Sequence, residues 1–172
     1  MGKSFVTETP EELISNAERD IMNVKVLISK KFHPADLMYN VISFHSTQAA
    51  EKLLKSYIIG KGKDVEKIHD LDDLQQTAMK IDASFAEIRD ACVSLNEFVP
   101  GVKYSNEKPI TKQKINNIIK SLEAVCDFPS IKALRDSFNK KHKYRIIAEE
   151  VIGPGAKTTA NLKKKKSSRK KQ

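Results

Sequence analysis

The first part of the chain carries apolar residues at the spacing of an amphipathic helix. They recur at intervals of four, four, three and four residues, so they lie on one side of a helix that faces a core. Thr9 can cap this helix, Pro10 suits its first position, and Glu12 completes a capping box. The pattern predicts a helix that starts at Pro10 and that Pro34 ends. Its apolar residues are Leu13, Ala17, Ile21, Val24 and Ile28.

A second and a third helix follow from the same signals. The second is expected from about Ala35 to Ile59, where Gly60 and Gly62 end it. Asp70 can cap a short third helix. The core-facing residues expected here are Leu37, Val41, Phe44, Leu54, Tyr57 and Ile58 in the second helix, and Leu71, Leu74, Ala78 and Ile81 in the third.

Two further helices are predicted in the second half of the chain. Asp82 is the expected cap of the fourth, which Pro100-Gly101 ends, and Thr111 is the expected cap of the fifth. Pro129 ends or kinks the fifth helix, and Ser130 can restart it. The expected inward residues are Phe85, Ile88, Cys92, Leu95 and Val99, then Ile115, Ile118, Leu122 and Val125, then Ile131, Leu134 and Phe138.

The fold class follows from this series of helices. No segment shows the sustained alternation of a strand, so we predict an all-α fold, an up-and-down bundle of four to five helices with short loops over residues 1–150. From Ile152 the amino-acid composition changes. Gly-Pro-Gly follows, and after it comes a Lys-rich run. Residues 151–172 are therefore expected to be a disordered basic C-terminal tail.

The charge of the chain is concentrated in that tail. The net charge is +9, but eight basic and no acidic residues follow Glu150, so the body holds 23 basic and 22 acidic residues. The tail is either a solvated extension or an arm that binds RNA or DNA phosphates without sequence preference. In a eukaryote its KKKKSSRKK run would also be similar to a nuclear-localisation signal.

Several classes of protein are excluded by what the sequence lacks. No stretch approaches the length of a membrane span, and the N-terminus has no hydrophobic run of a signal peptide, so we expect a cytoplasmic protein without membrane contact. Cys92 and Cys126 occupy apolar helical positions and are expected in the core. There is no Walker loop, no Gly-x-Ser-x-Gly elbow and no metal-ligand spacing, so neither a metal nor another cofactor is expected.

A polar set interrupts the apolar pattern of the second helix. His45, Gln48 and Lys52 lie at i, i+3 and i+7, hence on one face, and Glu51 and Lys55 form an i, i+4 pair beside them. One interpretation is a cleft that binds a phosphate or a base. The other is structural, with His45 and Gln48 satisfied by neighbouring helices and Lys52 paired with Glu51 at the rim. A further histidine, at position 69, precedes the capping Asp70 and is expected to fix a loop.

These polar residues belong to a longer motif. Phe44–Ile59 reads FHSTQAAEKLLKSYII, and Lys67–Leu74 reads KIHDLDDL. Together they resemble the signature of HEPN domains, and the resemblance extends over roughly residues 8–128. It implies a helical bundle, commonly a homodimer with a polar cleft between its subunits. Many similar stand-alone members are encoded beside a minimal nucleotidyltransferase in toxin–antitoxin or related modules, so a nucleotidyltransferase partner is expected.

The resemblance also raises the question of catalysis. Catalytic HEPN proteins resemble metal-independent ribonucleases in which an Arg precedes a His by a short spacer. Nucleotidyltransferase-linked members often have Arg-Tyr-Pro after the fourth helix, whereas this chain has Lys103-Tyr104-Ser105, and no His follows before the fifth helix. Arg135 and His142 do match the nuclease spacing, and on one helix they would lie about 10 Å apart along a face. A solvated basic helix end and a non-catalytic contact to RNA or a partner are the alternatives there.

The sequence thus supports three hypotheses. The first is a HEPN binding module for nucleotide, RNA or a nucleotidyltransferase partner, with His45, Gln48, Lys52, Lys103 and Tyr104 as contacts. The second is a metal-independent endoribonuclease toxin that uses Arg135 and His142. The third is a structural or partner-binding bundle with a solubilising tail.

Overall fold

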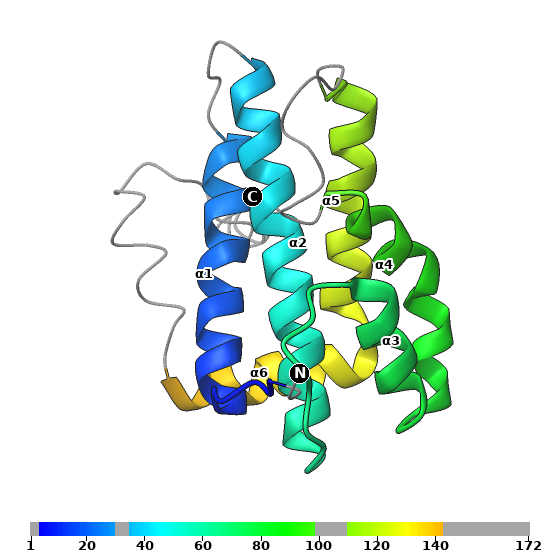
Figure 1. The fold of residues 1–172 in the computed structure, drawn as a ribbon. Helices are drawn as coiled ribbons and strands as arrows, with labels where there is room; N and C mark the ends of the chain where they lie inside the picture. Colours follow the sequence, from blue (N-terminus) through cyan, green and yellow to red (C-terminus); the bar gives the residue numbers. More distant parts are fainter. Residues whose placement is uncertain (1–3, 30–34, 99–109, 143–172) are drawn as a thin grey trace, which may run out of the picture. The chain divides into compact units, whose positions relative to one another are not determined.

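The computed structural model describes residues 4–29, 35–98 and 110–142, and these ranges are almost entirely helical (Figure 1). Residues up to Arg135 form one compact unit, and Asp136 onward belongs to a second unit. The all-α prediction is confirmed. The elements are α1 (Pro10–Ser29), α2 (Ala35–Gly60), α3 (Leu71–Met79), the 3₁₀ helix η1 (Ala83–Ile88), α4 (Arg89–Asn96), α5 (Lys112–Asp127) and α6 (Pro129–His142).

The helices begin where the capping residues predict. Thr9 and Glu12 form a reciprocal capping box, in which the Glu12 amide donates to Thr9 Oγ1 at 3.2 Å and the Thr9 amide donates to Glu12 Oε2 at 2.8 Å. Asp70 accepts hydrogen bonds from the amides of Asp72 and Asp73 at the start of α3, and Thr111 accepts one from the Lys114 amide at the start of α5.

Helix α2 is the centre of the bundle. It packs against α1, α3, α4 and α5, so apolar side chains are needed around most of its circumference. Leu53, Leu54 and Ile58 are fully buried. The core includes an aromatic cluster, in which the Phe85 ring lies 4.5 Å from the rings of both Tyr57 and Phe128.

Two details differ from the sequence-based expectation. The predicted fourth helix is divided into η1 and α4. The Asp82 carboxylate accepts hydrogen bonds from the Ser84 amide at 3.0 Å and from the Ser84 hydroxyl at 2.6 Å. These hydrogen bonds tighten the first turn into a 3₁₀ helix. Ile28 is 48% exposed, so the core-facing stripe of α1 ends at Val24. Pro34, Val99 and the predicted tail lie outside the described residues, as does the side chain of Leu37.

Both cysteines lie in the core as predicted. Cys92 and Cys126 are buried and free. Burial raises the pKa of the Cys92 thiol to about 12 and that of Cys126 to about 11. Neither is a thiolate near neutral pH, so neither has the character of a nucleophile.

Candidate functional site

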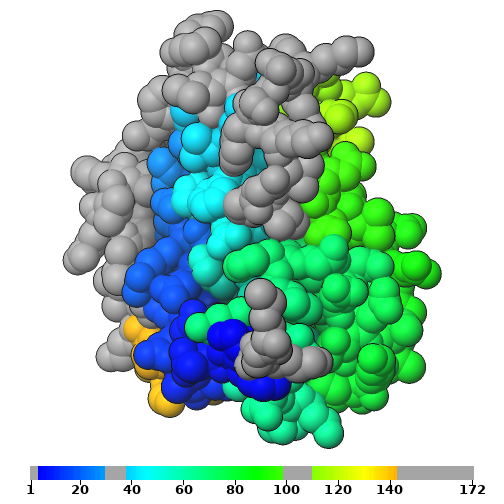
Figure 2. Space-filling model, in the orientation of Figure 1, coloured from blue at the N-terminus to red at the C-terminus, as the bar shows by residue number. Residues whose placement is uncertain are grey.

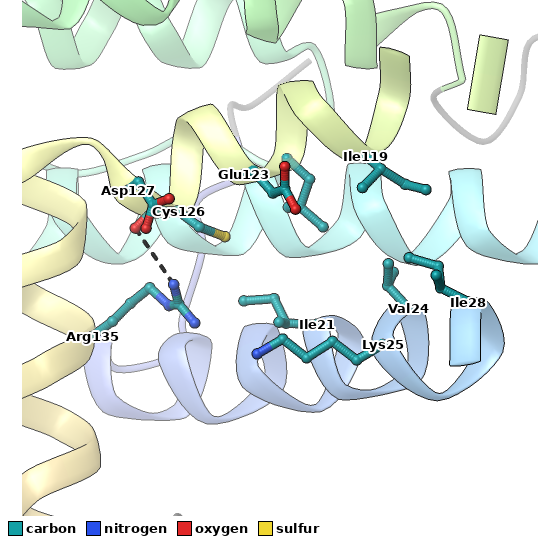
Figure 3. Close-up of a pocket in the computed structure, with 10 residues that line it drawn as sticks. Ile21, Val24, Lys25, Ile28, Ile119, Glu123, Cys126, Asp127 and Arg135 are labelled. Carbon is teal, nitrogen blue, oxygen red and sulfur yellow. Dashed lines mark hydrogen bonds between the residues drawn. The ribbon is translucent and has the colours of Figure 1, made fainter. Parts of the chain in front are cut away.

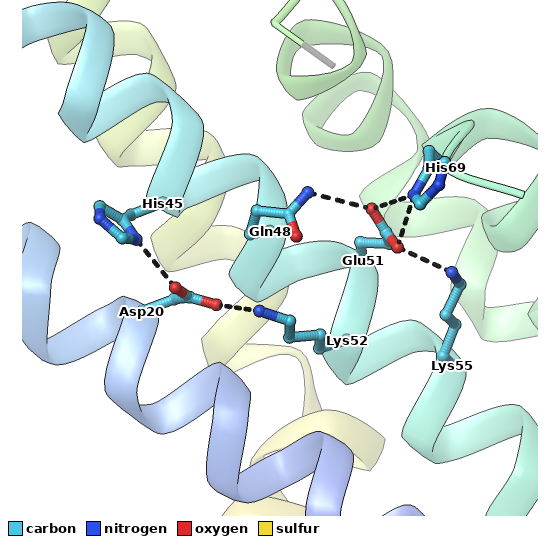
Figure 4. Close-up of polar contacts among 7 residues, drawn as sticks. All are labelled: Asp20, His45, Gln48, Glu51, Lys52, Lys55 and His69. Carbon is cyan, nitrogen blue, oxygen red and sulfur yellow. Dashed lines mark hydrogen bonds and ion pairs between the residues drawn. The ribbon is translucent and has the colours of Figure 1, made fainter. Parts of the chain in front are cut away.

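Two of the predicted polar residues of α2 converge on a carboxylate of α1 (Figure 4). His45 Nδ1 lies 2.8 Å from Asp20 Oδ1, and Lys52 Nζ lies 2.5 Å from Asp20 Oδ2. Only 11% of the Asp20 side chain is exposed, against 22% for His45 and 24% for Lys52. Asp20 therefore joins α1 to α2 through a partly buried three-residue cluster.

A second carboxylate organises the neighbouring turn of α2. Glu51 accepts hydrogen bonds from Lys55 Nζ at 2.7 Å and from Gln48 Nε2 at 3.3 Å, and its two oxygens lie 3.1 and 3.2 Å from His69 Nδ1. The Glu51 and Lys55 side chains are only 5% and 6% exposed. His69 comes from the loop before α3, so the cluster links α2 to that loop (Figure 4).

One expected pairing is confirmed and another is wrong. The i, i+4 pair of Glu51 and Lys55 forms as predicted, whereas Lys52, which the structural interpretation paired with Glu51 at the rim, pairs with Asp20. The helix explains the change, since each residue advances about 100° around its axis. His45 and Lys52 point toward α1, Glu51 and Lys55 lie on the side of His69, and Gln48 lies between the two groups.

The hydrogen bonds to the carboxylates determine which ring nitrogen of each histidine remains available to bind a ligand. An ionised carboxylate can only accept, so Nδ1 of both His45 and His69 carries a proton. Nε2 is then the remaining functional nitrogen, and within residues 4–29, 35–98 and 110–142 it has no hydrogen-bond partner on either ring. The His69 side chain is 63% exposed. It is therefore the most accessible polar group of the two clusters.

Sequence reasoning missed Asp20 and gave His69 only a loop-fixing role. Asp20 lies three residues after Ala17 and four before Val24, inside the arc of the apolar stripe. An acid within such a stripe must find a partner when the helix packs, and this was the available signal. His69 gave no comparable signal, because its partner Glu51 is 18 residues away.

Neither a metal site nor a membrane span is found in the part of the chain that the structure describes. There, no group of three or more His, Cys, Asp or Glu side chains could hold a metal ion. Nor is any helix in that part long and apolar enough to cross a membrane.

Comparison with protein families identifies the family to which the helical bundle belongs. The model of the HEPN domain matches residues 10–134, which include α1 to α5, both carboxylate clusters and the first turns of α6. The chain belongs to the HEPN domain family. No curated protein and no solved structure matches it. Membership suggests a function connected with nucleotides or RNA.

The two predicted nuclease residues lie just beyond the matched HEPN region. Arg135 forms a two-pronged ion pair with Glu18 of α1, with 2.5 Å from Nε to Oε1 and 3.2 Å from the second terminal nitrogen to Oε2. Its other terminal nitrogen donates to the Cys126 carbonyl at 3.4 Å. Burial works against the guanidinium charge, but the hydrogen bonds to Glu18 and the charges of Glu18 and Asp127 outweigh it and raise the Arg135 pKa.

Arg135 also borders a pocket whose lining is mainly apolar. It lines one end of this pocket of about 240 Å³ between α1 and α5, together with Ile21, Val24 and Ile119 (Figure 3). The Arg135 side chain is only 16% exposed, and every nitrogen of its guanidinium has a protein acceptor. Arg135 is therefore held in a structural ion pair and does not form an open site for a phosphate.

The remaining predicted residues are placed less fully. His142 is the last residue of α6, and its ring lies 4.4 Å from that of Phe138 in the same helix. Lys103 and Tyr104 fall within the HEPN match but outside the described residues, so their role as contacts stays a prediction.

Proposed function

We propose that this HEPN domain is a non-catalytic module that binds nucleotide or RNA through His45, Gln48 and His69, with Lys52 positioning Asp20; these four residues are here called the α2 polar face. The observation that supports it most is the pair of histidines whose rings are oriented by buried carboxylates, at 2.8 Å for His45 and 3.1 Å for His69. Such support fixes the ring orientation and the tautomer. A binding group held in this way loses little entropy when a ligand arrives.

The charge balance of the α2 polar face indicates what it would recognise. Asp20 and Glu51 are matched by Lys52 and Lys55, so the clusters are close to neutral while the imidazoles are neutral. A neutral imidazole Nε2 accepts a hydrogen bond from a base amino group or a ribose 2′-hydroxyl. The face is therefore suited to bases and ribose, and Lys52 acts as a positioning group for Asp20 rather than as a phosphate ligand.

Phosphate affinity would then come from other parts of the chain, among them the Lys-rich tail with its eight basic residues. A homodimer and a nucleotidyltransferase partner belong to the same proposal, since both follow from the resemblance to toxin–antitoxin HEPN modules. The endoribonuclease alternative is less favoured, because each guanidinium nitrogen of Arg135 already donates one hydrogen bond to Glu18 or to the Cys126 carbonyl.

Removing the exposed imidazole tests the proposal. We expect His69→Ala to weaken the binding of a fluorescein-labelled single-stranded RNA about tenfold, because a hydrogen bond to a ligand contributes about 1.4 kcal/mol. The melting temperature should stay near the wild-type value, since His69 is 63% exposed and Glu51 keeps Lys55 and Gln48 as partners. Fluorescence anisotropy gives the affinity, and circular dichroism gives the melting temperature.

His142→Ala is the matched control, because it also removes one exposed histidine. It should bind the RNA as tightly as the wild type. Equal affinity of wild type and His69→Ala would contradict the proposal, as would a loss of binding that appears only together with unfolding.

A further inference from the structure

The first ten residues of α5 contain no acidic residue, and the first acidic residue of the helix is the exposed Glu123, three residues after Lys120. Between Lys112 and Ser121 there are three lysines and no Asp or Glu. Lys112, Lys114 and Lys120 are all exposed. None of them forms an ion pair with another residue that the structure describes, in contrast to Lys52 and Lys55. Their charges therefore remain available to a ligand.

Amide side chains lie between these lysines around the exposed part of α5, with Lys114 at its far edge. Gln113, Asn116 and Asn117 are exposed. Lys112, Asn116 and Lys120 follow one another at i, i+4 and i+8 and form a row with about 6 Å between neighbours along the helix axis. Gln113 and Asn117 form a second row beside it. Together with Lys114 these residues are called the α5 basic face.

The orientation of this face is determined by the core. Ile115, Ile118 and Leu122 on the other side of α5 are 3%, 1% and 4% exposed. Rotating the helix would expose these three apolar side chains, which is unfavourable. The α5 basic face is thus held outward in the folded protein.

The segment that contains α4, a neighbour of α5, has the opposite charge. Residues 70–98, which include α3, η1 and α4, contain seven acidic and two basic residues. Helix α4 packs against α5. The start of α5, yellow-green in Figure 2, reaches the surface above the green residues of α4. A polyanion is repelled by the acidic region and attracted to the start of α5, so the charge pattern directs it to one surface.

We infer that the α5 basic face binds the sugar–phosphate backbone of single-stranded RNA. This inference rests on the proposed function and adds a phosphate-binding surface to it. Lysine, asparagine and glutamine are the residue types that contact phosphate and sugar. The face carries no aromatic side chain on which a base could stack, so the contacts we propose are to the phosphates and sugars.

The test removes the three charges and keeps the helix. The full-length triple variant Lys112→Gln, Lys114→Gln, Lys120→Gln should fold normally, because Gln and Lys have nearly equal helix propensity. We expect roughly tenfold weaker binding of single-stranded RNA and a salt dependence whose slope falls by about 2, at about 0.7 per lost phosphate contact. Binding of a dinucleotide, too short to occupy both surfaces, should not change.

A matched control has the same loss of charge elsewhere. Lys63→Gln, Lys80→Gln, Lys132→Gln replaces three exposed lysines outside α5 and should leave the slope much closer to that of the wild type. Equal effects of the two triple variants would overturn the inference alone, since RNA would still bind through the α2 polar face. Equal competition by polyglutamate would also overturn it, and absence of RNA binding by the wild type would overturn both proposals.

Discussion

Replacing Glu51 by glutamine is expected to lower the free energy of unfolding by about 3 kcal/mol and the melting temperature by about 10 °C. The Glu51 side chain is 5% exposed, and the Lys55 side chain that it binds is 6% exposed. Without the carboxylate, the Lys55 ammonium would be left in the core beside a neutral amide that cannot balance its charge. Thermal and urea unfolding followed by circular dichroism measure the change.

A double-mutant cycle separates the ion pair from other effects of the substitution. Lys55→Met should also destabilise the protein, because it leaves Glu51 with only Gln48 and the exposed His69 as donors. The double variant Glu51→Gln, Lys55→Met should be more stable than the sum of the two losses predicts, since neither partner is left charged and alone. Additive losses, or a Glu51→Gln variant that melts like the wild type, would contradict this description of the cluster.

Arg135→Ala is expected to have a loss of stability of similar size, about 3 kcal/mol or more. The substitution leaves Glu18, whose side chain is 14% exposed, without its two-pronged partner and removes the donor to the Cys126 carbonyl at the junction of α5 and α6. Arg135→Lys should recover only part of the stability, because an ammonium cannot reproduce the two parallel hydrogen bonds to Glu18.

His142→Ala serves as the comparison for Arg135. It truncates an exposed side chain at the last residue of α6 and should leave the melting temperature nearly unchanged. A catalytic pair would behave differently, because both substitutions would abolish RNA cleavage while the protein stayed folded. An Arg135→Ala variant as stable as the wild type would therefore contradict the structural role that we infer for Arg135 from its contact with Glu18.

Local features of the fold were predictable from the sequence. The capping box of Thr9 and Glu12 and the cap at Thr111 involve residues three apart, so their geometry follows from the helix itself. The same holds for the i, i+4 pair of Glu51 and Lys55. The exposure of Ile28 was not predictable in this way, because burial depends on which elements pack nearby.

The partners of the buried charges could not be predicted, because they are distant in the sequence. Asp20 is 25 residues from His45 and 32 from Lys52, and Glu18 is 117 residues from Arg135. The spacing of Arg135 and His142 matched a nuclease motif, but spacing alone does not show that a guanidinium is already bound to a carboxylate. Only the contact between Arg135 and Glu18 in the folded chain revealed the role of Glu18.

The most direct test of the proposed function is to incubate the full-length protein with single-stranded RNA in EDTA and examine the RNA on native and denaturing gels. A non-catalytic HEPN binding module retards the RNA on the native gel and leaves it intact on the denaturing gel. Cleavage that persists in EDTA and is lost in His142→Ala, or the absence of any retarded species, would contradict the account.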